Sequence, residues 1–254
     1  MTGPDPIDYQ AITPFRRATE IVGIDRQLAT AEVEDDHHHF RVEVEARDGV
    51  IARVSGTAVR RPWTMCALAV AELQKLVGAP LSEDPTAVLG YANIRLQCTH
   101  LFDLAGLAVA ALGRGQVGLR RYDMTVTPLS EGRWRAEIDR DDGLRHDWTV
   151  LLGEIAEPEA LAGKSLKAPF SDWARSWFDA DGFEAALLLR RAIFVGKFRH
   201  LFDLDKRESA AEGRYNIGGC FVLQPGRVAD AKRIKGATTS FPLMGLGPLA
   251  RDHD

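Results

Sequence analysis

Three segments of the chain concentrate side chains that can carry proton transfer or bind a metal. They are the Asp-Asp-His-His-His run at residues 35–39, the segment around Cys66, and Cys98-Thr99-His100, with Asp103 three residues after the histidine. Imidazole, thiol and carboxylate groups serve as acid–base or nucleophilic catalysts and also as ligands for zinc or iron. No Cys-x-x-Cys pair is present, so local spacing alone is only a weak indication of a metal site. These segments predict a site and leave catalysis and metal binding open.

The histidine run begins a strand in which side chains alternate between two faces. This alternation places His38 on the apolar face with Phe40, and His37 and His39 on the polar face, although either could turn inward at the strand's end. A solvated rim is the alternative interpretation of the run. We expect His38 to enter the site and leave the roles of its two neighbours open.

The segment at Cys98 immediately precedes a helix predicted over residues 99–112. Unpaired N–H groups at a helix start favour anions and lower the pKa of a nearby thiol, so Cys98 is expected to be reactive. Asp103 lies on the same side of that helix as His100 and is expected to fix the tautomer of the imidazole. His38, His100, Cys98 and Asp103 are therefore the predicted catalytic residues.

The second thiol, Cys66, follows two arginines and a tryptophan. Arg60 and Arg61 are expected to clamp a substrate carboxylate and are counted with Trp63 as substrate-binding residues, although the arginines could equally be solvated. Buried cysteines are usually small apolar core residues, and this is the interpretation for Cys220 in its glycine-rich segment.

The elements around these residues alternate between sheet and helix. Residues 18–59 form an antiparallel meander with a hairpin turn at Asp48-Gly49, because glycine accepts the positive φ that tight hairpins need. A helix is predicted over residues 64–77, a second β region over residues 122–155, and further helices over residues 171–202. The tail after Gly236 is expected to pack as an irregular arm.

Composition excludes several classes of protein. The 254 residues are 45% hydrophobic and 27% charged, which indicates a globular chain, and a net charge of -4 offers no general attraction to nucleic acid or anionic lipid. No segment is apolar and long enough to cross a bilayer, and no signal peptide is apparent, so we expect a cytoplasmic protein. No dinucleotide fingerprint or P-loop is present, which disfavours redox and phosphoryl-transfer chemistry.

Two resemblances rest on the cysteine segments. RRPWTMCALAVAELQKLVGAPL and CTHLFDL are similar to an uncharacterised bacterial family with a Pro-Trp…Cys segment and a Cys-Thr-His-Leu motif. More distantly, residues 36–112 resemble the NifU/IscU-type iron–sulfur scaffold proteins in the order and spacing of their elements, most specifically at LQCTHL, residues 96–101. This second resemblance implies an antiparallel sheet with helices packed on one face.

The scaffold resemblance also implies a ligand set, which this chain changes. Cys66 and Cys98 stand at two of the family's three thiolate positions, the region of residues 36–38 occupies the first, and Gln97 replaces a histidine. A three-thiolate cluster platform is therefore broken, while a mixed site for zinc or iron remains reasonable. The candidate ligands, if a metal is present, are His37, His38, His39, Cys66, Cys98 and His100.

Together these observations predict an α+β fold and an enzyme. We expect one domain over residues 1–254, with a scaffold-like core at residues 17–113 and an extension at residues 114–254, a β-hairpin and a long helix, that roofs the site. The expected function is a lyase or hydrolase acting on a small, possibly aromatic, catabolic substrate by histidine acid–base or metal-assisted chemistry. The alternatives are a metal or iron–sulfur carrier and a non-catalytic partner subunit. The expected partner is a small molecule, with neither nucleic acid nor membrane, and a homo-oligomer is also considered.

Overall fold

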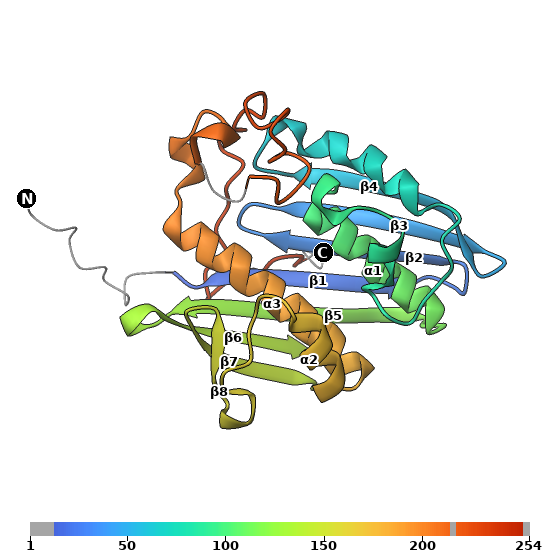
Figure 1. Ribbon diagram of the computed structural model, residues 1–254, viewed down its shortest axis with the longest axis horizontal. Coiled ribbons are helices and arrows are strands. Elements are labelled where there is room, and N and C mark those ends of the chain that lie inside the picture. The colour runs from blue at the N-terminus through green and yellow to red at the C-terminus, as the bar shows by residue number, and fades with distance from the viewer. Residues whose placement is uncertain (1–12, 214–216, 251–254) are drawn as a thin grey trace, which may run out of the picture.

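One antiparallel sheet runs through both parts of the chain (Figure 1). The computed structural model describes residues 13–213 and 217–250. Its eight-stranded sheet has the order β4-β3-β2-β1-β5-β6-β7-β8, so the strands after residue 113 extend the first meander through the pairing of β1 with β5. The strands are β1 Phe15–Gly23, β2 Leu28–Asp35, β3 His39–Arg47, β4 Val50–Arg60, β5 Gly118–Pro128, β6 Arg133–Arg140, β7 Arg145–Leu151 and β8 Glu154–Glu157.

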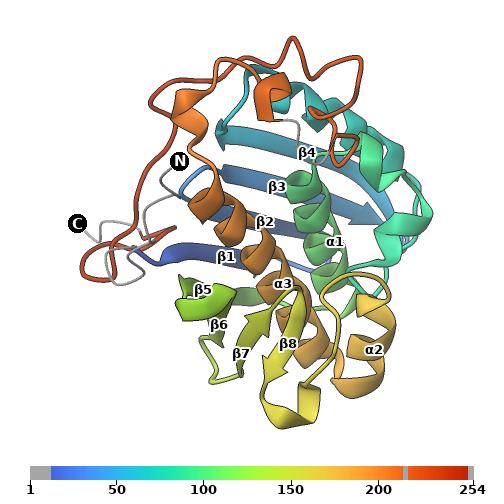
Figure 2. The same cartoon turned by 60° about the vertical axis from the view of Figure 1, so that its left-hand side comes forward.

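The helices that matter for the site lie on one face of this sheet. α1 packs on β2 and β3, and α3 packs on β5 and β6, so the two helices cover neighbouring parts of the same face (Figures 1 and 2). The longer helices are η1 Thr64–Leu76, α1 Thr99–Gly113, α2 Phe170–Trp177 and α3 Ala180–Leu201. The short 3₁₀ helices are η2 Ala87–Gly90, η3 Ile94–Leu96, η4 Ser130–Gly132, η5 Glu159–Leu161, η6 Leu204–Lys206 and η7 Ala210–Gly213. The predicted α+β class, an antiparallel sheet with helices on one face, is confirmed.

Residues with positive φ mark two turns of the sheet, one that the sequence predicts and one that it does not. Asp48 and Gly49 both have positive φ, 53° and 77°, as the predicted hairpin between β3 and β4 requires. The segment that alternates from His146 onwards is two strands, because Leu152 and Gly153 also take positive φ, 52° and 91°, and reverse the chain between β7 and β8. The second β region is therefore a four-stranded meander, larger than the expected hairpin.

The helix predicted over residues 64–77 forms as the 3₁₀ helix η1. Cys66, Ala69, Leu73 and Leu76 are its buried residues, a stripe that recurs every three or four positions. This stripe holds η1 beside β4 and turns the Cys66 side chain toward the sheet face that α1 covers. η1 begins at Thr64, as predicted, directly after Trp63.

The chain after Gly236 packs as the expected irregular arm. The N–H of Thr239 donates to the carbonyl oxygen of Asp36 at 2.8 Å, and the N–H of Leu249 donates to Glu34 Oε2 at 2.7 Å. These bonds tie the arm to the end of β2 and to the residue that follows it. Within residues 13–213 and 217–250, none of the helices combines the length and the apolar character that crossing a membrane requires.

Candidate active site

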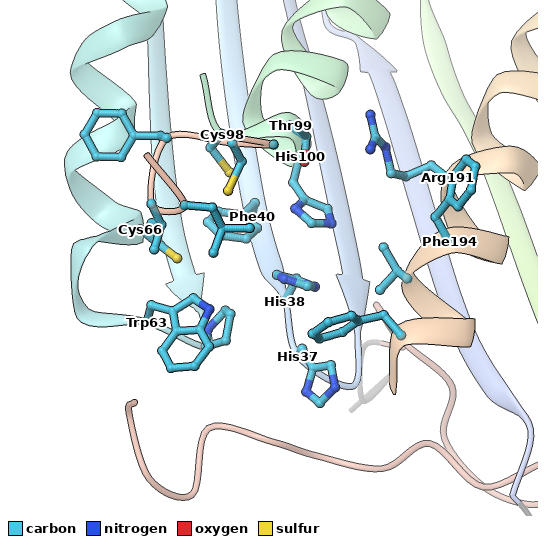
Figure 3. A pocket seen from close by; sticks show the side chains of 18 of the residues that line it. His37, His38, Phe40, Trp63, Cys66, Cys98, Thr99, His100, Arg191 and Phe194 are labelled. Atoms are coloured by element: carbon cyan, nitrogen blue, oxygen red, sulfur yellow. The ribbon is translucent and has the colours of Figure 1, made fainter. Parts of the chain in front are cut away.

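A cavity of about 280 Å³ lies where the start of β3, the start of η1, the start of α1, the C-terminal part of α3 and residues 219–223 meet (Figure 3). Its lining combines imidazole and thiol groups with many aromatic rings. The lining residues are His37, His38, Phe40, Pro62, Trp63, Cys66, Cys98, Thr99, His100, Arg191, Phe194, Val195, Phe198, Leu204, Gly219, Cys220, Phe221, Val222 and Leu223. The second part of the chain therefore supplies a large share of the wall.

Asp35, the last residue of β2, builds the turn that presents His38 to this cavity. Its Oδ1 accepts hydrogen bonds from the backbone N–H groups of His37 and His38, both at 2.9 Å. The same oxygen is 2.9 Å from His38 Nδ1. A short polar side chain that bonds the backbone two and three residues ahead is a common way to fix a turn. Here the same carboxylate also orients the imidazole.

The Asp35 carboxylate is completely buried and remains ionised because it contacts His38 and Arg17. Arg17 Nη1 lies 2.5 Å from Asp35 Oδ2, and the two side chains are 3% and 0% exposed. Burial by itself would raise the pKa of Asp35, but the neighbouring His38 and Arg17 lower it well below its usual range. A carboxylate can only accept a hydrogen bond, so Nδ1 of His38 carries the proton and Nε2 is left as the acceptor of that ring.

His100 stacks on His38 at the start of α1. The ring centroids are 4.0 Å apart and the planes are inclined by 27°, while Phe40 lies nearly parallel to His100 at 5.8 Å. Nε2 of His100 is shielded from solvent and has no hydrogen-bond partner. Burial, and after it the neighbouring His38 and Arg17, lowers the pKa of His100 well below its usual value. The His100 ring is therefore neutral at neutral pH.

His37 also lines the cavity, an outcome that the sequence left open. β2 ends at Asp35 and β3 begins at His39, so His37 lies in the turn between them, where the two-residue alternation does not apply. It is 3% exposed and lines the cavity, and neither ring nitrogen has a hydrogen-bond partner. Burial lowers the pKa of His37 to about 4, so it too is neutral at neutral pH.

All three cysteines of the chain line the cavity as free thiols. The expectation that the helix start lowers the pKa of Cys98 is wrong, because burial raises that pKa to about 12 and outweighs the N–H groups of the first turn. Burial also raises the pKa of Cys66 and of Cys220. In this arrangement, without a metal, the three groups are neutral thiols and not ready nucleophiles.

Asp103 does not lie where the sequence placed it. Its carboxylate pairs with Arg191 on α3, with Arg191 Nε at 2.7 Å from Oδ2 and Nη2 at 3.2 Å from Oδ1. Asp103 therefore joins α1 to α3 and does not orient His100. The carboxylate that orients a histidine is Asp35, and the histidine that it orients is His38.

The predicted substrate-binding residues divide in the same way. Trp63 lines the cavity and is 7% exposed. Arg60 instead braces the turn from outside, with Nη2 at 2.7 Å from the carbonyl oxygen of Asp35 and Nη1 at 2.7 Å from that of Asp36. Arg61 donates to the carbonyl oxygen of Ala58 at 2.8 Å. Neither arginine lines the cavity: Arg60 ends β4 and supports the turn, and Arg61 bonds to the backbone of β4.

His39, one of the candidate metal ligands, lies outside the cavity. It is the first residue of β3, its Nε2 is 2.6 Å from Glu32 Oε1, and it borders a different hollow lined by Glu20, Glu32 and Glu34. Within the described residues, one group of three potential ligands comes close together: donor atoms of Asp35, His38 and His100 lie within 4.8 Å of one another. Both oxygens of Asp35 are already engaged by hydrogen bonds, so a metal would have to replace some of these.

Arg191 and Cys220 line the cavity, although neither was among the predicted site residues. Arg191 had a signal, since Arg190 and Arg191 interrupt the most apolar stretch of the chain and a buried charge of this kind needs a partner or a ligand. Cys220 had none, because its approach to Cys66 and Cys98 depends on the path of the chain around residues 219–223.

Comparison with known proteins bears on the first part of the chain. Residues 18–112 match the family described as "Protein of unknown function (DUF2889)". The prediction of an uncharacterised family is thus confirmed. No curated protein and no solved structure matches the chain. The resemblance to the NifU/IscU-type scaffolds therefore stays a prediction.

Proposed function

We propose that this protein is a small-molecule enzyme, a lyase or hydrolase, in which His38 is the acid–base group. The observation that carries the proposal is the hydrogen bond between His38 Nδ1 and the buried Asp35 carboxylate beside a cavity. A carboxylate that holds one ring nitrogen fixes the tautomer and stabilises the imidazolium that forms when the other nitrogen accepts a proton. Proton transfer is the chemistry that this pair supports best.

Two reaction classes use such a pair with no further group. In a lyase, His38 Nε2 takes a proton from a substrate carbon and returns it to the leaving oxygen, so a double bond forms as water departs. In a hydrolase, Nε2 takes a proton from water as the hydroxide adds to a carbonyl carbon, and returns it to the leaving group. The neutral thiols and the neutral His100 provide a low-polarity wall around His38, in which its charge acts strongly.

Arg17 and Asp35 have positioning roles in this proposal. Arg17 keeps the pKa of Asp35 low, and Asp35 keeps the His38 tautomer fixed, so neither needs to touch the substrate. We further propose that the substrate is a small aromatic molecule of catabolism and that the protein acts in the cytoplasm. The support for the substrate class is the number of aromatic rings that line the cavity.

Metal-assisted chemistry is the second candidate, favoured by the proximity of Asp35, His38 and His100 and by the unpartnered Nε2 of His100. Two histidines and a carboxylate are suitable ligands for zinc or non-haem iron. Metal analysis of protein purified without added metal tests this candidate. If the wild type holds one equivalent of zinc or iron and His100→Gln loses it, the metal-assisted mechanism takes the place of the metal-free one. A substoichiometric metal content that is unchanged in His100→Gln would exclude the metal-assisted mechanism.

Replacement of His38 tests the acid–base proposal, with His39 as its matched control. We expect His38→Gln to lower turnover of an active compound, found among small aromatic hydroxy acids and esters, by about 10²-fold or more. His39→Gln removes the neighbouring imidazole on the other side of the strand and should leave turnover unchanged. Equal turnover in wild type and His38→Gln would refute the proposal.

A spectroscopic measurement tests the same pair without a substrate. We expect the ¹⁵N spectrum of the histidine side chains to show His38 protonated at Nδ1, and we expect Asp35→Asn to change that signal. A His38 signal protonated only at Nε2 would contradict the geometry on which the proposal rests.

A further inference from the structure

The wall of the cavity indicates the kind of molecule that it holds. Aromatic side chains from three parts of the chain face it, including Trp63, Phe194 and Phe221, and none of its described lining residues is an aspartate or glutamate. A volume of about 280 Å³ is at the small end of ligand pockets. The cavity therefore suits a small, largely apolar body.

Arg191 is the one arginine or lysine among the described lining residues. Asp103 holds Nε and Nη2 of its guanidinium, and Nη1 makes no hydrogen bond to any described residue. Because two of its three nitrogens are anchored, the third can meet a ligand with little loss of side-chain freedom. The Asp103 charge also outweighs burial and keeps the pKa of Arg191 above its ordinary value, so the group remains cationic.

A second feature favours an anion at the same side of the cavity. α1 is a helix of 15 residues, and its first turn, at Thr99 and His100, lines the cavity close to Arg191 (Figure 3). The free N–H groups of a helix start attract negative charge. An arginine and a helix start together form a suitable carboxylate site.

His37 gives an independent indication that a ligand completes this cavity. It lines the cavity near the end of β2, is 3% exposed, and both its ring nitrogens lack a partner (Figure 3). Burying unpaired polar atoms is costly, so a hydroxyl or carbonyl group of a bound molecule would satisfy an otherwise unfavourable arrangement.

We propose that the cavity binds aromatic monocarboxylic acids, with the carboxylate on Arg191 Nη1 at the start of α1 and the ring against Phe194 and Phe221. A hydroxyl or carbonyl substituent of the ring meets His37. This inference rests on the proposed function, because such an acid would be the molecule on which His38 acts. It replaces Arg60 and Arg61 as the expected carboxylate clamp.

Calorimetric titration of the full chain with phenylacetate and with its neutral analogue phenylacetamide tests the inference. We expect phenylacetate to bind about tenfold or more tightly than the amide, because the acid gains a charge-assisted hydrogen bond. Arg191→Gln should remove this preference and leave amide binding unchanged. Arg190→Gln is the matched control, since this neighbouring arginine donates to the carbonyl oxygen of Leu166 and does not line the cavity, and it should keep the preference.

The titration tests whether the cavity prefers a carboxylate and whether that preference depends on Arg191. Equal affinity for acid and amide in wild type, a preference that survives Arg191→Gln, or no binding of phenylacetate at millimolar concentration would overturn the inference. Thermal melts show whether Arg191→Gln folds. If it does not, Arg191→Lys decides in its place: the shorter point charge should weaken acid binding several-fold without changing amide binding.

His38→Gln separates this inference from the proposed function. We expect it to retain the preference for phenylacetate while it loses turnover. If acid binding depends on Arg191 but turnover does not depend on His38, the binding site stands and the proposed function fails. If turnover depends on His38 while acid and amide bind equally, the proposed function stands and the substrate class is wrong.

Discussion

Removing the Arg17 guanidinium should destabilise the protein severely, because it leaves a buried carboxylate without its nearest cation. Arg17 and Asp35 are 3% and 0% exposed and their atoms are 2.5 Å apart. Breaking a buried ion pair from one side costs about 3–5 kcal/mol, a large fraction of the 5–15 kcal/mol that typically holds a domain folded. We therefore choose Arg17→Met, which retains much of the apolar stem of the side chain.

Urea unfolding followed by circular dichroism measures this cost. With a slope of about 3 kcal/mol per molar urea, the expected loss moves the midpoint down by about 1–1.7 M. The matched control is Arg53→Met, since Arg53 is 60% exposed and its pairs with Glu43 and Glu45, at 3.1 Å, lie in solvent. Exposed pairs contribute about 0–1 kcal/mol, so the control should move the midpoint by about 0.3 M or less.

The difference in unfolding free energy between wild type and Arg17→Met should also depend on pH. Because Arg17 and His38 hold the folded-state pKa of Asp35 well below its usual value, the ionised pair contributes full stability above the unfolded pKa and loses it as the pH falls toward the folded one. The gap between wild type and Arg17→Met should therefore keep its full size from pH 7 down to about pH 4, near the pKa of an aspartate in the unfolded chain, and narrow below that pH. A shift no larger than that of Arg53→Met, with no dependence on pH, would refute the view that Arg17 holds the carboxylate ionised.

Two further predictions concern α3. Gly196→Ala should cost about 1–3 kcal/mol of stability, because the added Cβ would lie 2.9 Å from Phe15 Cδ1. Gly90→Ala is the control and should be close to neutral, because no atom lies within 4 Å of its added Cβ. Thermal melts compare the stability of the two variants. Burial, and after it the charge of Arg199, lowers the pKa of His200 to about 4, so its neutral form contributes stability above about pH 6.5 that is lost as the pH falls toward 4. His200→Gln should flatten this acid limb of the curve of unfolding free energy against pH, and an unchanged limb would show that His200 does not cause it.

The sequence predicts an element correctly where residues close together in the chain determine its conformation. The Asp48-Gly49 hairpin and the start of α1 directly after Cys98 both follow from short-range preferences. The split between β7 and β8 did not follow, because Leu152 takes a positive φ that its residue type disfavours and no sequence signal marks it.

Long-range geometry decided the parts of the site that the sequence missed. Asp103 is well placed for His100 on an isolated helix, but α3 packs beside α1 and Arg191 takes its carboxylate. The pKa of Cys98 has a similar explanation: the helix start lowers it, yet the depth of burial decides the sign, and burial depends on the second part of the chain. Residue type and spacing alone cannot supply either quantity.

The cavity is lined by residues of the matched segment, residues 18–112, and by residues of the chain after residue 113. The matched family segment, residues 18–112, contains Asp35, His38 and His100, whereas Arg191 and several aromatic wall residues come from α3 and residues 219–223. In the proposed function, the first part then supplies proton transfer and the second part supplies recognition of the substrate. Changes on the cavity side of α3 should therefore alter which acid binds, while the tautomer of His38, set by Asp35 within the matched segment, stays the same.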